Sequence, residues 1–229
     1  MPLPGSLMNI LRGGRASGGG STSSNSTFSS RKGGEVVVNT RQSRGLEEFF
    51  SYIRDQSGLT ILDLAGATQQ NVSFITNLGH RLYSEDFLAI LRETFGQEAP
   101  TDQSNAGQVE YFLRQALDYE PGKFDGVLAW DVLEYLGPVL LPAVVERLHK
   151  IVKPKSYILA FFHNDAKLEA VPFYSFRIQA MNSLQVGQQG ARQPAQLFNN
   201  RSLEKLFGNF DSVKFFLTKE RLREVIIKA

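Results

Sequence analysis

Residues 124–136 read FDGVLAWDVLEYL, and this stretch decides the fold. Its apolar part, 126–130, is typical of a strand that is buried on both faces of a sheet. A helix is predicted over 138–152, with Pro138 in its first turn, where a missing backbone N–H costs little. A second buried strand is predicted over 156–162. A strand, a helix and a strand in this succession predict two parallel strands of one sheet.

The same alternation extends toward the N-terminus. The apolar run 60–64 predicts a strand, and the small residues 65–67 after it predict a tight turn into a helix over 69–78. A further strand is predicted over 80–83 and a helix over 87–95. The sheet is therefore expected to hold at least four strands, with helices on both faces.

The rest of the chain adds more elements. The apolar spacing over 109–117 favours a helix, although a strand could lie near 111–113. A helix is predicted over 203–207. Two strands are predicted over 213–217 and 224–228, close enough in sequence to form a hairpin.

In sheets of parallel strands, ligands bind beyond the carboxyl ends of the strands. The residues that follow each predicted strand are therefore candidates for a site. They are residues 63–69, 85–86, 130–131 and 163–165.

Three of these segments, in this order and spacing, resemble the class I S-adenosylmethionine-dependent methyltransferases. The first is 124–136, which is similar to the family's fourth strand and the helix after it. The second is 148–159, LHKIVKPKSYIL, with Lys155 and Ser156 where the family usually has two glycines. The third is the pair of terminal strands. The resemblance extends over 59–228.

The resemblance implies an α/β fold, Rossmann-like, with a seven-stranded mostly parallel sheet, an antiparallel last strand and helices on both faces. It also implies S-adenosyl-L-methionine as the cofactor and a methyltransferase activity. The family places three glycines after its first strand, where this chain has Ala65, Ala67 and Gln69, while Gly66 falls between them. Glycine matters in such a loop because the backbone approaches the cofactor closely. Asp63, at the end of the strand, is expected near the methionine part of the cofactor.

The resemblance also assigns roles to residues after the other strands. Asp86 is expected to accept hydrogen bonds from the ribose hydroxyls, since a carboxylate offers two acceptor oxygens to a diol. Asp118 is expected to contact adenine if a third strand ends there. Trp130 lies where the methyl group and the acceptor meet, with core packing as the alternative. Asp131 and His163 are the candidate catalytic residues, with helix capping and a structural role as their alternatives.

Composition limits the chemistry. The chain has 229 residues, no cysteine and three histidines that are far apart in sequence, so no thiolate or histidine-rich metal site is expected. The formal net charge is +2, of which residues 1–45 carry +5 and the remainder −3. The folded part is therefore mildly acidic, which makes a nucleic-acid partner unexpected. The longest charge-free apolar stretch of the core is too short to cross a membrane.

The domain organisation follows from the same composition. Residues 1–34 hold eight glycines and eight serines, so a disordered basic tail is predicted over 1–42. The methyltransferase-like domain is predicted over 43–229. Its long connection, 166–197, is expected to be a lid or insertion over the acceptor, or an added element that only packs.

The leading hypothesis is a cytoplasmic methyltransferase that acts on a small molecule. One alternative is a protein with the same fold that binds or scaffolds without catalysis. A second alternative is a methyltransferase of nucleic acid or protein. A nicotinamide-binding Rossmann domain is a weaker rival, because its glycine fingerprint is missing from 65–70.

Overall fold

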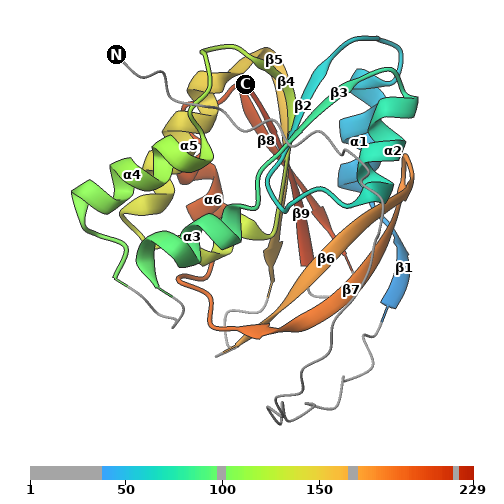
Figure 1. Cartoon of the computed structure of the whole chain (residues 1–229). Coiled ribbons are helices and arrows are strands. Elements are labelled where there is room, and N and C mark those ends of the chain that lie inside the picture. The colour runs from blue at the N-terminus through green and yellow to red at the C-terminus, as the bar shows by residue number, and fades with distance from the viewer. Residues whose placement is uncertain (1–37, 97–101, 165–169, 219–221) are drawn as a thin grey trace, which may run out of the picture. The chain divides into compact units, whose positions relative to one another are not determined.

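A six-stranded sheet forms the centre of the fold in the computed structural model, which describes residues 38–96, 102–164, 170–218 and 222–229 (Figure 1). Its strands lie in the order β3 (Arg81–Ser84), β2 (Thr60–Asp63), β4 (Phe124–Trp130), β5 (Val152–His163), β9 (Leu222–Lys228) and β8 (Ser212–Leu217). The first four are parallel to one another, whereas β9 runs antiparallel to both β5 and β8. The predicted mostly parallel sheet with an antiparallel last strand is confirmed.

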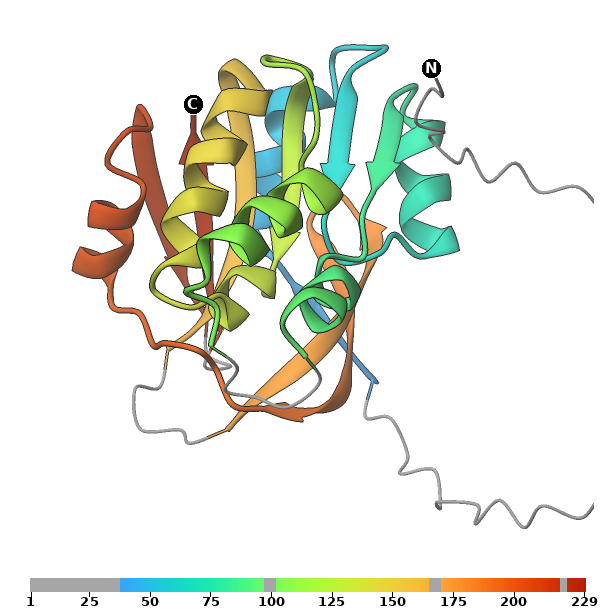
Figure 2. The ribbon, with the colours of Figure 1, turned by 60° about the vertical axis from the view of Figure 1, so that its left-hand side comes forward.

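Helices cover both faces of this sheet (Figures 1 and 2). One face carries α1 (Arg44–Ile53) and α2 (Gln69–Asn77), and the other carries α3 (Phe87–Phe95), α4 (Ala106–Ala116), α5 (Leu140–Ile151) and α6 (Asn200–Leu206). Each face has its own apolar core. The α1 face buries aromatic side chains such as Phe49 and Phe50, and the α5 face buries aliphatic ones such as Val144 and Leu148. The predicted two-sided covering is therefore confirmed.

Side chains fix the first turns of several helices. Ser43 caps α1 by accepting a hydrogen bond from the Leu46 N–H, and Thr68 caps α2 in the same way. Asp86 caps α3, and its carboxylate accepts from the Ala89 N–H at 2.9 Å. These caps satisfy N–H groups that the helices themselves leave without a partner.

A second sheet packs beside the carboxyl ends of the central one. It has the order β1 (Val38–Gln42), β7 (Ser183–Arg192), β6 (Val171–Ala180), and both pairings are antiparallel. The domain therefore begins at least five residues before the predicted start at 43, because 38–42 pair with β7. The predictions made for residues 1–37 lie outside the described residues. Most of 166–197 forms the hairpin β6–β7.

Within the described residues the central sheet has six strands, where seven were predicted. The missing one is the third strand of the resemblance, because residues 106–116 form α4. The helix that the apolar spacing favoured is confirmed. It buries Phe112 and Leu113 against the α3 side of the core. The strand that was to end at Asp118 is thus absent from the described residues.

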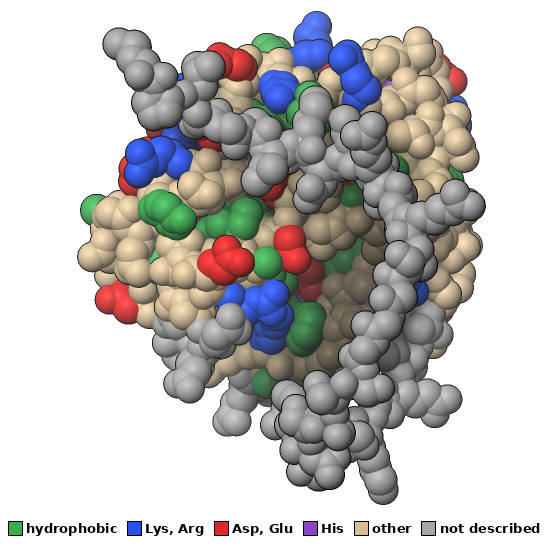
Figure 3. Space-filling view, in the orientation of Figure 1, with side chains coloured by type: hydrophobic (Ala, Val, Ile, Leu, Met, Phe, Trp, Pro, Cys, Tyr) green, Lys and Arg blue, Asp and Glu red, His purple; other side chains and the backbone are tan. Residues whose placement is uncertain are grey.

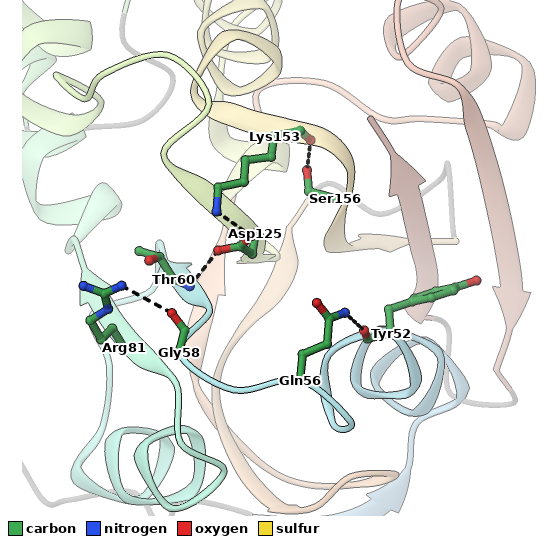
Figure 4. A network of polar contacts seen from close by, with 8 residues as sticks. All are labelled: Tyr52, Gln56, Gly58, Thr60, Arg81, Asp125, Lys153 and Ser156. Carbon is green, nitrogen blue, oxygen red and sulfur yellow. Dashed lines mark hydrogen bonds and ion pairs between the residues drawn. The ribbon is translucent and has the colours of Figure 1, made fainter.

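The amino ends of the strands are tied together by polar contacts at the edge opposite the candidate site (Figure 4). Asp125 accepts hydrogen bonds from the Thr60 N–H at 2.9 Å and from the Lys153 Nζ at 2.7 Å, which links β2, β4 and β5.

Lys155, at the position where the resembled family has glycine, has a φ of 67°. A lysine in this left-handed region carries backbone strain. No helix in the described part of the chain is long and apolar enough to span a membrane.

Candidate functional site

A cavity of about 350 Å³ lies beyond the carboxyl ends of β2, β3 and β4. Ala65, Asp86 and Asp131, which follow these three strands, all line it. The hairpin β6–β7 forms another wall with several aromatic side chains, among them Phe173 and Tyr174. In the space-filling view, acidic and basic side chains gather around a hollow near the centre of this face (Figure 3). The structure thus brings residues from three predicted strand ends to one cavity.

The loop after β2 takes a course that only glycine adopts without strain. Gly66 has a φ of 72°, and its N–H donates to the carbonyl of Glu85 at 3.0 Å. Ala65 forms an isolated bridge with Asp86, which draws the loop against the end of β3. The left-handed residue of this loop is therefore Gly66 itself, while Ala65 and Ala67 keep ordinary backbone conformations.

Asp63 is fully buried beneath this loop and does not line the cavity. Its carboxylate accepts hydrogen bonds from the Ala65 N–H at 2.9 Å, the Trp130 Nε1–H at 2.9 Å and the Asn71 Nδ2 at 3.4 Å. Burial raises its pKa, although these three donors act in the opposite direction. Asp63 therefore orients the loop, as expected for a buried carboxylate that needs partners.

Trp130 packs in the core and does not line the cavity. Its side chain is fully buried, and its ring stacks on Phe176 with 5.0 Å between centroids and 5° between planes. Its φ of 50° is an uncommon conformation for a large residue. The backbone turn at the end of β4 and the bond to Asp63 together fix the indole under the hairpin.

Asp86 lines the cavity with a carboxylate that is only partly used. Its Oδ1 caps α3, and its Oδ2 has no hydrogen-bond partner among the described residues. Its neighbour Glu85 instead bonds the hydroxyl of Tyr119, and burial raises the pKa of Glu85. Of this acidic pair, Asp86 is the one that faces the cavity.

Asp131 follows β4 and belongs to a buried acidic cluster. Burial, reinforced by the negative charge of Glu134, raises the pKa of Asp131 to about 7. Its Oδ2 accepts a hydrogen bond from the Tyr174 N–H at 3.3 Å, which ties it to the hairpin. It makes no side-chain cap to the short 3-10 helix η1 (Val132–Tyr135) that follows, so the capping alternative is not observed.

His163 is buried next to this cluster. Glu134 lies in η1, and its carboxylate bonds both the His163 N–H and the His163 Nδ1, each at 2.5 Å. The His163 Nε2 is buried and has no hydrogen-bond partner among the described residues. The ring lies beside that of Tyr174, with 5.9 Å between centroids. His163 thus lies behind Asp131 and outside the residues that line the cavity.

Three other predicted site residues lie outside the cavity. Gln69 begins α2 and is exposed, where its amide contacts Ser73. The Ala67 N–H is bonded to the Ser84 hydroxyl at 2.6 Å. Asp118 is exposed after α4 and does not line the cavity, because the strand that would carry it there is absent from the described residues.

The structure adds cavity residues that the sequence did not indicate. Arg92 comes from α3 and Arg192 from the end of β7, and both line the cavity. Asn71 from α2 also lines it and is bonded to the hairpin. Glu134 was visible within the segment 124–136, but only the fold brings it to His163. No group of His, Asp or Glu side chains suited to a metal occurs among the described residues.

No protein-family model matches the chain, and no curated protein matches it. Solved structures with a similar fold include the 1,6-didemethyltoxoflavin-N1-methyltransferase of Burkholderia thailandensis (11% identity, 80% of this chain and 76% of that chain, TM-score 0.46). They also include S-adenosylmethionine-dependent methyltransferases of Methanosarcina mazei (14%, 76% and 93%, TM-score 0.44) and of Aquifex aeolicus (10%, 80% and 88%, TM-score 0.43). At such identities the likeness concerns the fold alone. All three of these solved structures are methyltransferases.

Proposed function

We propose that the protein is an S-adenosylmethionine-dependent methyltransferase that acts on a small molecule. The observation that carries the proposal is the cavity at the carboxyl ends of β2, β3 and β4, which is where an α/β sheet of this kind binds its ligand. The Burkholderia protein was solved with S-adenosylhomocysteine and 1,6-didemethyltoxoflavin bound.

The residues at the cavity fit the cofactor. Its volume of about 350 Å³ lies within the range of small-molecule sites. Gly66 lets the backbone of the loop approach a ligand, and the free Oδ2 of Asp86 offers an acceptor to a ribose diol. When bound, S-adenosylmethionine supplies an electrophilic methyl group on its sulfonium.

We assign Asp131 as the residue that takes the proton released by the methyl acceptor. It lines the cavity, and a pKa of about 7 leaves its carboxyl group able to take or hold a proton near neutral pH. Burial raises this pKa and the charge of Glu134 adds to the effect, and Glu134 in turn holds the imidazole of His163. In this proposal Glu134 and His163 are positioning residues, and the hairpin keeps water from the cluster.

Isothermal titration with S-adenosylhomocysteine tests the proposal. We expect measurable binding by the wild type and a loss of more than tenfold in affinity for Asp86→Ala, since the carboxylate that lines the cavity would lose its bonds to the ribose hydroxyls. Asp211→Ala, an exposed aspartate between α6 and β8, is the matched control and should bind as the wild type does. Absence of binding at millimolar cofactor would exclude the proposal.

A binding protein without catalysis is the second candidate, and Asp63 favours it. The indole of Trp130 and the amide of Asn71 already occupy the carboxylate that is expected near the methionine end of a cofactor. Binding of S-adenosylhomocysteine without transfer of a labelled methyl group from S-adenosylmethionine to any small-molecule pool would support this candidate.

A further inference from the structure

Two guanidinium groups face the same cavity. Arg92 lies in the last turn of α3, Arg192 ends β7, and both side chains are half-buried. Within the described part of the chain, neither forms an ion pair with a carboxylate inside 4.0 Å. Two positive charges in one partly buried cavity repel each other, and an anion between them would remove this cost.

Arg192 is held in place by aromatic rings rather than by an acid. Its guanidinium carbon lies 4.2 Å from the centroid of the Phe173 ring and 5.7 Å from that of Tyr135. Contacts with ring faces orient a guanidinium while its N–H groups stay available for an anion. Burial lowers the pKa of Arg192, and the charge of Arg92 lowers it further, which agrees with two close cations, although Tyr135, Asp131 and Asp86 act in the opposite direction.

The acids of the cavity are bonded elsewhere. Asp86 directs one oxygen to the start of α3, and the Asp131 Oδ2 accepts a hydrogen bond from the Tyr174 N–H, so neither forms a close ion pair with these arginines among the described residues. Aromatic side chains, Phe173 and Tyr174, line the same part of the hairpin. This side of the cavity therefore combines two guanidinium groups with flat aromatic rings.

We propose that Arg92 and Arg192 bind an anionic group, a carboxylate or a phosphate, on a methyl acceptor whose planar part contacts Phe173. This proposal rests on the proposed function, because it names the class of acceptor. A guanidinium presents a planar fork of donors that matches the oxygens of either anion. The arginines come from α3 and β7, whereas the amino-acid end of the cofactor is expected at the 63–69 loop, so the cofactor's own carboxylate is a separate ligand.

Titrations with benzoate, phenyl phosphate and the neutral benzyl alcohol, followed by nuclear magnetic resonance, test the proposal. We expect the wild type to bind at least one of the two anions in preference to benzyl alcohol. Arg92→Gln and Arg192→Gln should each weaken anion binding about tenfold, the effect of one charge-assisted contact. The anion affinity of Arg192→Lys should lie between those of the wild type and Arg192→Gln, because lysine keeps the positive charge and lacks the planar guanidinium donors. Arg114→Gln, an exposed arginine of α4, is the matched control.

A parallel titration with S-adenosylhomocysteine separates this proposal from the proposed function. Unchanged affinity for S-adenosylhomocysteine in both arginine variants, together with weakened anion binding, supports the acceptor site. A loss of S-adenosylhomocysteine binding in these variants would assign the arginines to the cofactor and overturn the inference. A wild type that binds S-adenosylhomocysteine but neither anion would also overturn it, with the proposed function intact. Anion binding without cofactor binding would instead refute the proposed function and keep the anion site.

Discussion

Replacement of Asp131 by asparagine should change how stability depends on pH. Burial raises the pKa of Asp131 to about 7, whereas an unfolded aspartate has a pKa of about 3.9. Because the folded pKa is the higher one, the folded state binds the proton more tightly. The group's contribution to stability is thus complete below pH 4 and is lost as pH rises to 7. The total amounts to about 4 kcal/mol, since one pKa unit corresponds to about 1.4 kcal/mol.

Urea unfolding of the wild type and Asp131→Asn at pH 5 and at pH 8 measures this effect. Asparagine is nearly isosteric, can still accept from the Tyr174 N–H and does not titrate. The stability of the variant relative to the wild type should therefore increase by about 2–3 kcal/mol from pH 5 to pH 8. The exposed control Asp211→Asn should show no such increase. A difference between wild type and Asp131→Asn that is the same at both pH values would refute the reasoning, including the assignment of Asp131 as a proton acceptor.

Three further substitutions test the backbone and the loop under the cavity. Lys155→Gly should raise the free energy of unfolding by up to about 1 kcal/mol in urea, because glycine adopts a φ of 67° without strain; a decrease would contradict this. Gly126→Ala should lower it by about 1–3 kcal/mol, since the added Cβ would lie 2.7 Å from the Phe49 Cζ, and an unchanged melting temperature would show that the ring gives way. Trp130→Phe should cost about 1–3 kcal/mol, because buried Asp63 loses a donor, and a neutral outcome would mean that water replaces the indole N–H.

The fold was predictable where single elements carry strong patterns. The apolar runs of β4 and β5 are buried on both faces, so their composition alone identifies them. The hairpin β6–β7 was not predicted, since β7 is rich in glutamine and glycine and becomes a strand through its pairing with β1 and β6. Strand propensity depends on such neighbours, which no local window contains.

Some residues of the candidate site could also be predicted from the sequence, and others could not. Asp86 and Asp131 follow predicted strands, and the rule that ligands bind at strand ends was sufficient to select them. Arg92 and Arg192 are 100 positions apart, on a helix and on the hairpin, and their meeting depends on tertiary packing. Asp63 was also selected from its place at a strand end, but its bond from Trp130 is seen only once β2 and β4 are adjacent.

Buried contacts bind the hairpin β6–β7 to the rest of the fold. Asn71 donates to the carbonyl of Phe176 at 3.1 Å and accepts from the Ile178 N–H at 2.9 Å, so a buried amide of α2 takes the place of a neighbouring strand. The Phe176 ring stacks on Trp130, which is itself bonded to the core. Opening the hairpin would expose these rings and leave buried polar groups without partners, each at a cost of about 1–3 kcal/mol.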